Sequence, residues 1–482
     1  MFKKTIASLL VASAFAAPAA YASIDLIAIG SLSGSSAGSF ADLSGLTAPL
    51  ENGIAGNYLG GMGSGLAWAG GNTFIATPDR GPNATAYNPA VDDTASYIAR
   101  FQTVTLTLTQ ASSGSLPFTL TPTLTATTLL SSATPLVYGT GAGLGKQIDG
   151  LTPIGSGAPG LNAINNTNYF TGRSDNFSSA QTSTFASNGR FDPEAVRVSN
   201  DGKSVFISDE YGPYVYQFDR ATGQRLKSFA LPANLAITNL SAQGAVEIAG
   251  NTVGRVTNKG MEGLAITPDG KTLVGIMQAP LEQDTKKNVR IVTIDIATGT
   301  THQFAYKLTA GSGVSEIVAI NDHQFLVDER DGKGLGDGSS AVAKQLYQID
   351  LTGAADVSAL SGDLSAKAVN KTMVLDMVSV LNANGISSDK IPSKIEGVAF
   401  GQDVVINGVT KHTIYVTNDN DFVPGTSGPN NFYVFAATDA DLGGKYLAQS
   451  ITAAVPEPES YAMLLAGLGL VGFMARRKKQ LA

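Results

Sequence analysis

The feature that most constrains the fold is a unit of short strands at residues 191–223 that recurs later in the chain. Alternating apolar and polar residues at Ala195–Val198 and Ser204–Ile207 predict two strands, and Asn200–Lys203 between them predicts a hairpin turn. Two further strands are predicted after the next turn signals, over Tyr214–Phe218 and Arg225–Ala230. Four short antiparallel strands joined by tight turns are typical of a propeller blade.

Three later copies of this unit follow, and each begins with a glutamate near the start of its first strand. These residues are Glu262, Glu316 and Glu396, after Glu194 in the first copy, at spacings of 68, 54 and 80 residues (262 − 194, 316 − 262, 396 − 316). Such variable lengths with a constant order indicate repeats with outer loops of different size. The 130 residues from Ser64 to Glu194 (194 − 64) leave room for two more units. We therefore predict an all-β fold, a β-propeller of about six four-stranded antiparallel blades.

Composition supports one large all-β domain over residues 23–452. The chain has 482 residues with 54 Gly, no Cys and 15% charged residues, so it is neither disordered nor stabilised by disulfides. A formal net charge of −7 argues against nucleic acid as a partner and favours cations at an acidic surface. A Gly/Asn/Ser-rich insertion at residues 139–189 is predicted to be a functional or surface loop.

The first 22 residues have the pattern of a secretory signal peptide. Lys3 and Lys4 precede an apolar run over Ile6–Ala17, and small residues follow at Ala20 and Ala22. This order predicts export and cleavage by signal peptidase before Ser23, because the apolar run is too short for a membrane span.

Residues 453–482 have the pattern of a second targeting signal. Val455–Glu459, with the sequence VPEPE, precedes an apolar run over Tyr461–Met474 and four basic residues at Arg476–Lys479. The run would halt as a transmembrane helix with its basic end in the cytoplasm. The segment resembles the PEP-CTERM sorting signal, which exosortase reads in Gram-negative bacteria that make extracellular polysaccharide. The resemblance implies transient membrane insertion and delivery to the cell surface or matrix, while a plain C-terminal anchor is the alternative.

The repeat places carboxylates on one rim of the propeller. The second strand of a hairpin returns to the face where the first began, so Glu194 and the pair Asp209–Glu210 share a rim. The same logic applies to each unit, and oxygen ligands without Cys and with only three His select a hard ion such as Ca²⁺. The predicted metal ligands are Asp79, Glu194, Asp209, Glu262, Glu316, Asp328, Glu396 and Asp419, and the predicted catalytic residues are Glu194, Glu262, Asp209 and Glu210. Capping of each blade by its own acid is the structural alternative.

Basic residues interleave with these acids and are candidates to hold an anionic group such as phosphate, with ordinary salt bridges as the alternative. They are Arg80, Arg197, Lys259, Arg330 and Lys394. Neither the G-x-S-x-G match at Gly34–Gly38 nor any of the three histidines stands in the context that a serine hydrolase or a zinc site needs.

Several of these stretches together resemble the family called esterase-like activity of phytase, a phytase-like propeller domain. They are TPDRGPN near the start, then FDPEAVRV with VFISDEYGP, then KGMEGLAITPDGKTL, and finally SKIEGVAF with IYVTNDNDF. The resemblance covers roughly residues 61–435. It implies a hydrolase of esterase or phosphoesterase type, plausibly dependent on calcium, with matching acids at Glu194, Asp209, Glu210, Glu262 and Glu396. The third unit departs from the pattern, having Ile317 where the others have Gly or Ala.

The functional hypothesis is a secreted, surface-sorted, metal-assisted esterase or phosphoesterase that acts on a small-molecule ester at an acidic channel mouth. The alternative is a non-catalytic surface or matrix propeller that binds glycan or protein, since a fold does not prove a function. A lactonase-like hydrolase of sugar-derived esters lies between the two.

Overall fold

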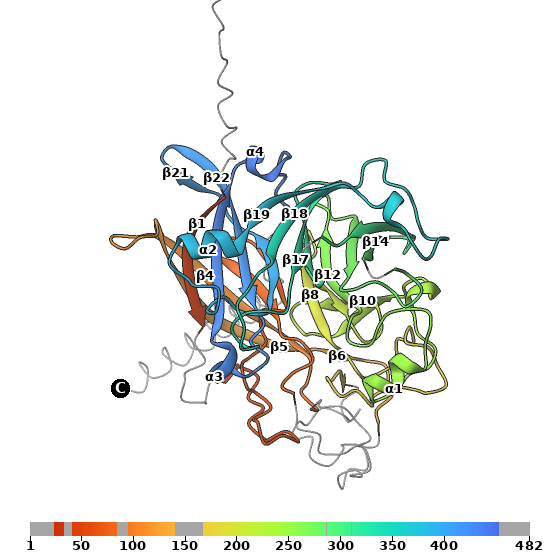
Figure 1. Cartoon of the computed structure of the whole chain (residues 1–482). Coiled ribbons are helices and arrows are strands. Elements are labelled where there is room, and N and C mark those ends of the chain that lie inside the picture. The colour runs from red at the N-terminus through yellow and green to blue at the C-terminus, as the bar shows by residue number, and fades with distance from the viewer. Residues whose placement is uncertain are drawn as a thin grey trace, which may run out of the picture.

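The structure is a computed structural model that describes residues 24–32, 41–83, 95–139, 167–285, 287–309 and 311–452. The predicted signal peptide and the predicted C-terminal apolar run lie outside these residues, as does most of the 139–189 insertion. The described residues form strands arranged around a common centre, with a few short helices at the edges (Figure 1).

Four sheets follow one another along the chain. Each has four antiparallel strands, which follow one another in sequence order from the centre of the ring outward. The predicted hairpins at residues 191–223 and in the later copies are confirmed by these sheets. The first sheet has β2 (Gly65–Trp68), β3 (Thr73–Thr77), β4 (Arg100–Gln110) and β5 (Phe118–Leu129), and the second has β8 (Pro193–Val198), β9 (Ser204–Asp209), β10 (Tyr214–Asp219) and β11 (Arg225–Phe229). The third sheet has β12 (Met261–Ile266), β13 (Thr272–Met277), β14 (Asn288–Asp295) and β15 (Thr301–Lys307). The fourth has β16 (Gly313–Ala319), β17 (Gln324–Arg330), β18 (Lys344–Asp350) and β19 (Lys371–Asp376).

The fifth sheet joins the two ends of the domain. It has the order β1-β23-β22-β20, so the N-terminal strand pairs antiparallel with the last strand, and β21 adds to β22. In Figure 1 the red β1 lies with the blue C-terminal strands. The strands are β1 (Asp25–Leu32), β20 (Ile395–Phe400), β21 (Val404–Ile406), β22 (Val409–Asn418) and β23 (Asn430–Ala437). This pairing closes the ring, because it joins the two ends of the domain in one blade.

The described residues therefore form a propeller of five blades, and the prediction of six is wrong. Residues 64–194 hold one blade instead of two, because β4 and β5 are long strands of 11 and 12 residues. The chain between β5 and β8 contains only a two-stranded sheet of β6 (Ser131–Ser132) and β7 (Asn168–Tyr169) among its described parts. Residue spacing alone could not separate a long blade from two short ones.

The innermost strands carry a β-bulge at or beside the position of the repeated glutamates. The pairing register shifts at residues 193–196 in β8, 261–263 in β12, 314–316 in β16 and 395–398 in β20. A bulge turns one extra residue out of the regular alternation and re-aims its side chain. Bulges at matching places in four blades thus turn matching residues toward the same mouth of the central channel.

Arg197 closes the channel below that mouth. At the matching position the other four blades have small residues, Ala67, Ala265, Val318 and Ala399. The Arg197 guanidinium donates to the carbonyls of Leu66 (2.6 Å), Val196 (2.5 Å), Ile317 (2.9 Å) and Val398 (3.4 Å), which belong to four blades. One long side chain thus fills the channel, which has no room for five long side chains, one from each blade. It also separates the two ends of the channel.

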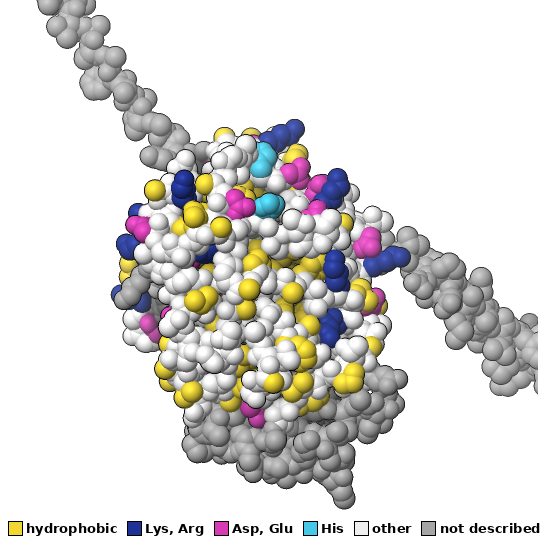
Figure 2. Space-filling model, turned by 90° about the vertical axis from the view of Figure 1, so that its right-hand side faces the viewer, with side chains coloured by type: hydrophobic (Ala, Val, Ile, Leu, Met, Phe, Trp, Pro, Cys, Tyr) yellow, Lys and Arg dark blue, Asp and Glu magenta, His cyan; other side chains and the backbone are white. Residues whose placement is uncertain are grey.

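The hydrophobic core lies between neighbouring blades. One cluster joins the β8–β11, β12–β15 and β16–β19 blades through residues such as Phe206, Leu264 and Ile317, and others join the remaining blades in the same way. On the side drawn in Figure 2, hydrophobic side chains are scattered among uncharged polar ones, with charged residues mostly near the margin.

The helices are short and peripheral. They are η1 (Ala233–Leu235), α1 (Gly244–Ala249), η2 (Ser365–Lys367), α2 (Met377–Ala383), α3 (Pro424–Ser427) and α4 (Asp439–Leu442). In the part of the chain that the structure describes, none has the length and apolar character that crossing a bilayer requires.

Candidate functional site: an acidic cavity at one mouth of the channel

Two sets of matching positions converge on the mouth where the innermost strands begin. The first set is the bulged residue of the innermost strand or, in the β2–β5 blade, the residue just before that strand. The second set is the residue that ends the second strand or follows it. The first set has Ser64, Glu194, Glu262, Ser315 and Glu396, and the second has Asp79, Glu210, Gln278, Arg330 and Asp419. All of these except Ser315 line one cavity of about 200 Å³, together with Arg80, Asn258 and Lys394.

One group of carboxylates in the cavity, the Glu194 cluster, consists of Asp192, Glu194 and Glu210. One oxygen from each lies within 4.8 Å of the others, and all three residues are buried. Asp192 accepts from Arg80 Nη1 at 3.1 Å and from the Arg80 backbone N–H at 2.9 Å. No ion pair among the described residues reaches Glu194 or Glu210. Glu194 and Glu210 therefore have no cation in ion-pair contact among the described residues, although the charges of Arg80 and Arg255 oppose the rise in the pKa of Glu210.

Glu262 extends this cluster from the next blade. Its carboxyl group shares a hydrogen bond with that of Glu210, which requires a proton between the two groups. Burial, followed by the charge of Glu210, raises the pKa of Glu262 well above its usual value, and burial followed by Asp192 raises the pKa of Glu210 to about 7. Glu210 Oε1 and Glu262 Oε2 are buried and meet no hydrogen-bond donor among the described residues.

The second group, the Asp419 cluster, consists of Asp79, Asp419 and Asp421, again with oxygens within 4.8 Å of one another. Here the protein supplies the cation. Lys394 Nζ lies 2.7 Å from Asp419 Oδ2 and 2.5 Å from Asp421 Oδ1. Burial opposes the ammonium charge, but Asp419, Glu396 and Asp421 together raise the pKa of Lys394 well above its usual value.

Arg330 and Arg80 bring two more cations to the cavity. Arg330 Nη2 lies 2.5 Å from Glu396 Oε1 and 3.7 Å from Glu262 Oε1, and its Nε donates to Ser315 Oγ at 2.5 Å. Burial opposes the charge of Arg330, yet Glu396 and Glu262 raise its pKa above the usual value. Six carboxylates thus line the cavity together with three cations, namely Asp79, Glu194, Glu210, Glu262, Glu396 and Asp419, while Asp192 and Asp421 lie beside them in the two clusters.

Five of the predicted site residues, Arg197, Glu316, Asp209, Lys259 and Asp328, lie away from this lining. Arg197 fills the channel and pairs with Glu316 at 2.9 Å. Asp209 accepts from the backbone N–H groups of Asp192 (3.1 Å) and Tyr211 (3.0 Å), so it shapes the loop that carries its neighbours. Lys259 is exposed beside the cavity, and its neighbour Asn258 lines it instead.

Glu316 differs from the other repeated glutamates because it stands one residue after the bulge of its strand, where they stand at the bulge. Ser315 is the extra residue there, so Glu316 takes the position of Ala195, Gly263 and Gly397 in the other blades. A shift by one residue turns a strand side chain to the opposite face. Glu316 therefore accepts from the backbone N–H groups of Leu264 and Ile317, both at 3.0 Å, and does not enter the cavity.

Asp328 is also buried outside the cavity. It stands where β3 and β9 have Thr77 and Ser208, whose hydroxyls donate to the carbonyls of Glu194 (2.6 Å) and Glu262 (3.3 Å) in the next blade. Neither Asp328 oxygen has a hydrogen-bond partner among the described residues, and burial raises the pKa of Asp328 well above its usual value. A protonated Asp328 would supply the O–H that threonine and serine supply in the other blades.

The sequence interpretation missed four residues that the fold brings to the cavity as ligands or wall. Asp192 lies two residues before Glu194 in the same FDPE stretch, and Asp421 two residues after Asp419, so each extends a predicted acid. Gln278 occupies the repeat position of Glu210, which an alignment of the units shows. Asn258 has a positive φ of 56° and accepts from Arg80 Nη1 at 2.6 Å, which no local pattern signals.

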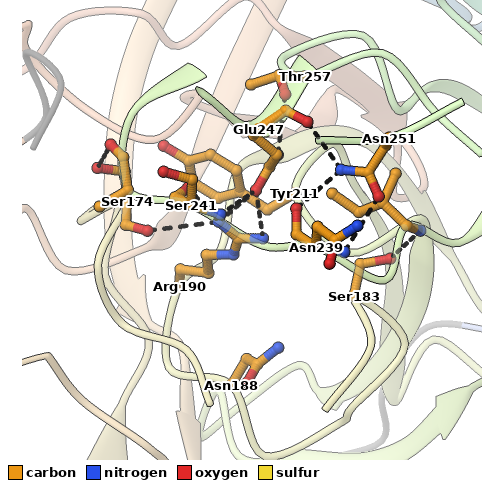
Figure 3. Close-up of polar contacts among 12 residues, drawn as sticks. Ser174, Ser183, Asn188, Arg190, Tyr211, Asn239, Ser241, Glu247, Asn251 and Thr257 are labelled. Atoms are coloured by element: carbon orange, nitrogen blue, oxygen red, sulfur yellow. Dashed lines mark hydrogen bonds and ion pairs between the residues drawn. The ribbon is translucent and has the colours of Figure 1, made fainter. Parts of the chain in front are cut away.

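A second, smaller pocket of about 100 Å³ adjoins the cavity, because Arg80 and Asn258 line both. Its wall is an ion-paired network in which Glu247 accepts from Arg190 at 3.4 Å (Figure 3). Glu247 also lies 2.8 Å from Arg255 Nη1. Burial works against the charge of Glu247, but Arg255 and Arg190 lower its pKa. The hydroxyl of Thr257 donates to the same carboxylate at 2.9 Å. The pocket is therefore polar with its charges already compensated.

Comparison with known families identifies the chain. The model of the phytase-like family, described as esterase-like activity of phytase, matches residues 57–422, and the PEP-CTERM protein-sorting motif matches residues 454–478. The chain belongs to the phytase-like family. The matched range contains all five innermost strands and every residue of the two clusters.

Individual relatives add little beyond the family. An uncharacterized secreted protein of Arthroderma benhamiae is 30% identical over 178 residues, which cover 29% of this chain and 34% of that one. The chain thus spans about a third of the length of that relative. Among solved structures, hydrazine synthase of Kuenenia stuttgartiensis (11% identity, TM-score 0.29, 75% and 78% of the two chains) and the β-propeller domain of Cps50 (Swd1) from Myceliophteria thermophila (10%, 0.21, 46% and 51%) are similar.

The acids of this phytase-like protein fit a metal ion. The Glu194 cluster offers three converging carboxylates, an all-oxygen donor set that suits a hard divalent cation, and Glu210 Oε1 points to no donor. The Asp419 cluster fits less well because Lys394 Nζ already contacts two of its members. The PEP-CTERM motif indicates export and association with the cell surface.

Proposed function

We propose that this phytase-like protein is a secreted, surface-sorted hydrolase that cleaves phosphoesters, with Ca²⁺ held by Asp192, Glu194 and Glu210. The observation that carries the proposal is the combination of unneutralised carboxylates and three cations in one buried cavity. Density of like charge at this level is costly without a compensating cation. A bound divalent ion would polarise the ester and lower the pKa of a water molecule beside it.

The basic residues select the charge of the substrate. Six carboxylates and three cations line the cavity, so it should repel an anion except near the metal cluster and the adjacent guanidinium of Arg80, where a phosphate group would bind. Arg330, which reaches the cavity from the facing blade, is placed to hold the same group from the other side. Lys394 is committed to the Asp419 cluster and serves to keep that side of the cavity intact.

Glu262 is the residue placed to move a proton. Its carboxyl group lies between Glu210 and Arg330, in hydrogen-bond contact with the first and 3.7 Å from the second. A carboxyl that is held protonated in a buried site can protonate a leaving alkoxide, which is the role of a general acid. The adjoining pocket beyond Arg80 and Asn258 would take the polar remainder of the substrate.

Hydrolysis assays test this function. The wild-type protein should cleave p-nitrophenyl phosphate with added Ca²⁺ and lose this activity in EDTA, and p-nitrophenyl acetate should be the poorer substrate because it lacks the anionic group. Glu262→Gln should lower kcat strongly, while Asp295→Asn, in an exposed turn of the same blade, should not. No activity on either ester with any metal would refute the enzyme and favour the non-catalytic surface propeller that binds glycan or protein.

Placement in the cell follows from the two terminal signals. Residues 1–22 would direct export and be removed by signal peptidase, and the motif at 454–478 would be read by exosortase at the inner membrane. The mature protein would then reach the cell surface or the extracellular matrix of a Gram-negative bacterium.

A further inference from the structure

The smaller pocket beside the acidic cavity is built by loops and not by the strands of the blades. Its wall comes from the chain after β7 (Ser174), the loop after β9 (Tyr211) and the connection between β11 and β12 (Ser241). Loops on a rigid scaffold are where a fold sets its specificity. Arg80 and Asn258 line both spaces, so a ligand held by Arg80 in the cavity extends past Asn258 into the pocket.

The guanidinium of Arg190 lines the pocket but is committed to the protein. It lies 3.4 Å from Glu247 Oε2 and stands over the ring of Tyr211, 5.0 Å from its centroid (Figure 3). Its Nη1 also donates to the carbonyls of Ser174 at 3.4 Å and Ser241 at 3.5 Å. Arg190 therefore has its partners without a ligand.

Arg255, the second partner of Glu247, does not supply a free cation to the pocket either. It is buried outside the pocket wall, 2.8 Å from Glu247 Oε1, and its charge also acts on Glu210 of the Glu194 cluster. Arg80 is the cation that borders both spaces, and its side chain is 19% exposed. One anionic group can thus bind at the junction, and the pocket beyond it offers no unpaired cation for another.

The groups that the pocket leaves for a ligand are uncharged. The Ser241 hydroxyl accepts a backbone N–H at 3.1 Å, and its own O–H has no acceptor among the described residues. Asn258 accepts from Arg80 through Oδ1, so its amide N–H groups remain available, and Thr257 Oγ1 donates to Glu247 while keeping its lone pairs. Donors and acceptors without net charge complement hydroxyl groups, which both donate and accept.

We propose that the substrate is a phosphoester of a small, uncharged polyhydroxy alcohol or sugar and carries a single phosphate. The phosphate lies at Arg80 and the Glu194 cluster, and the hydroxyl groups of the leaving alcohol occupy the pocket. A second phosphate would meet either the six carboxylates of the cavity or a pocket whose cations are already paired, and both arrangements disfavour it. This inference rests on the proposed function, because it names the substrate class of the same site.

Two sugar phosphates that differ by one phosphate test the inference. Fructose 6-phosphate has a hydroxyl group where fructose 1,6-bisphosphate has a second phosphate. Titration calorimetry uses the Glu262→Gln protein at matched free Ca²⁺, because this variant should bind the ligands without hydrolysing them. The Kd of the bisphosphate should be at least about tenfold higher than that of the monophosphate, since its extra charge finds no partner.

A change in the pocket should affect the sugar and not the phosphate. In the same background, Ser241→Ala should raise the Kd of fructose 6-phosphate by about three- to tenfold, the effect of one neutral hydrogen bond. The Kd of inorganic phosphate should change less, because this ion does not reach the pocket. Ser387→Ala, at an exposed residue outside both walls, is the matched control and should change neither value.

Equal or tighter binding of the bisphosphate would overturn the proposal, as would absence of binding by either sugar phosphate. An equal effect of Ser241→Ala on fructose 6-phosphate and on inorganic phosphate would also overturn it. Failure of the proposed function appears elsewhere, as absence of hydrolysis by the wild type, which these binding measurements do not include.

Discussion

The two carboxylate clusters of the cavity have the same number of acids and differ in what neutralises them. In the Asp419 cluster Lys394 Nζ contacts two of the three carboxylates, so the protein provides its own cation. In the Glu194 cluster Arg80 pairs with Asp192, and no described cation lies in ion-pair contact with Glu194 or Glu210, although the charge of Arg80 acts on Glu210. Under the proposed function, this difference makes the Glu194 cluster the ligand set and the Asp419 cluster a structural ion pair.

A third solution appears at Asp328, which has neither a metal-like cluster nor an ion pair among the described residues. It stands at the repeat position of a hydroxyl residue, and burial raises its pKa. A proton is then what keeps the group neutral. A metal ion, an ammonium group and a proton are thus three ways to neutralise a buried carboxylate.

The largest expected effect is at Glu210. Glu210→Gln removes a proposed ligand and the acceptor of the Glu262 hydrogen bond, so kcat/KM on p-nitrophenyl phosphate should fall roughly 100- to 1,000-fold. Asp421→Asn is the matched control in the other cluster, and its activity should stay within about tenfold of wild type. Steady-state kinetics at saturating Ca²⁺ measure both, and equal losses would show that the clusters do not differ in function.

Lys394 should give the next largest effect, on stability. Lys394→Met leaves Asp419 and Asp421 without their cation; the Lys394 side chain is 32% exposed, so we expect a loss of about 2 kcal/mol, less than for a fully buried pair. Ca²⁺ should recover part of it, because the vacated cluster becomes a second ion site. Urea unfolding with and without Ca²⁺ measures this, with Lys390→Met at an exposed pair as control. A variant as stable as wild type without metal would contradict the ion-pair role.

The pH dependence of stability should change at Asp328. Because its folded-state pKa is raised above the unfolded value, its contribution is complete at pH values below the unfolded pKa and is lost as pH rises toward the folded one. Asp328→Thr, with the hydroxyl that β3 has at this position, should remove a dependence of up to about 1.4 kcal/mol per pH unit in that window. Urea midpoints at pH 5 and pH 8 test it, and an unchanged difference between the two would argue that Asp328 is ionised.

The smallest effect is expected at Asn258, one of four described non-glycine residues with positive φ. Asn258→Gly should stabilise the protein by about 0.5 kcal/mol through relief of this backbone conformation, yet raise KM several-fold because Arg80 loses an acceptor at 2.6 Å. Asn407→Gly, at a φ of 51° in the turn between β21 and β22, should give the stability gain alone. A change in KM in both variants would show that the effect is not local.

The sequence was sufficient for the repeat and for the side of the fold on which its acids meet. Alternation and turn residues predicted the hairpins around Asp201, and the antiparallel geometry then placed Glu194 and Glu210 on one rim, as observed. The motif order at the C-terminus predicted the sorting signal that the family match shows. These are local patterns with little dependence on packing.

Features that depend on register or on packing in the channel could not be predicted. The bulge in β16 falls on Ser315, so Glu316, one residue later, is turned out of the cavity, and this offset between glutamate and bulge is not visible in a single sequence. Arg197 was predicted to bind substrate because it stands among the acids. The residues at matching positions in the other four blades are small, so the Arg197 side chain fills the channel instead. The blade count failed because strand length in β4 and β5 was not visible in residue spacing.

A calorimetric titration of Ca²⁺ into the metal-free protein tests the assignment of the Glu194 cluster most directly, since it needs no substrate. The account predicts one site in the wild type, loss of that site in Glu210→Gln, and its retention in Asp421→Asn. Absence of binding in the wild type, or its loss in Asp421→Asn with retention in Glu210→Gln, would contradict the account.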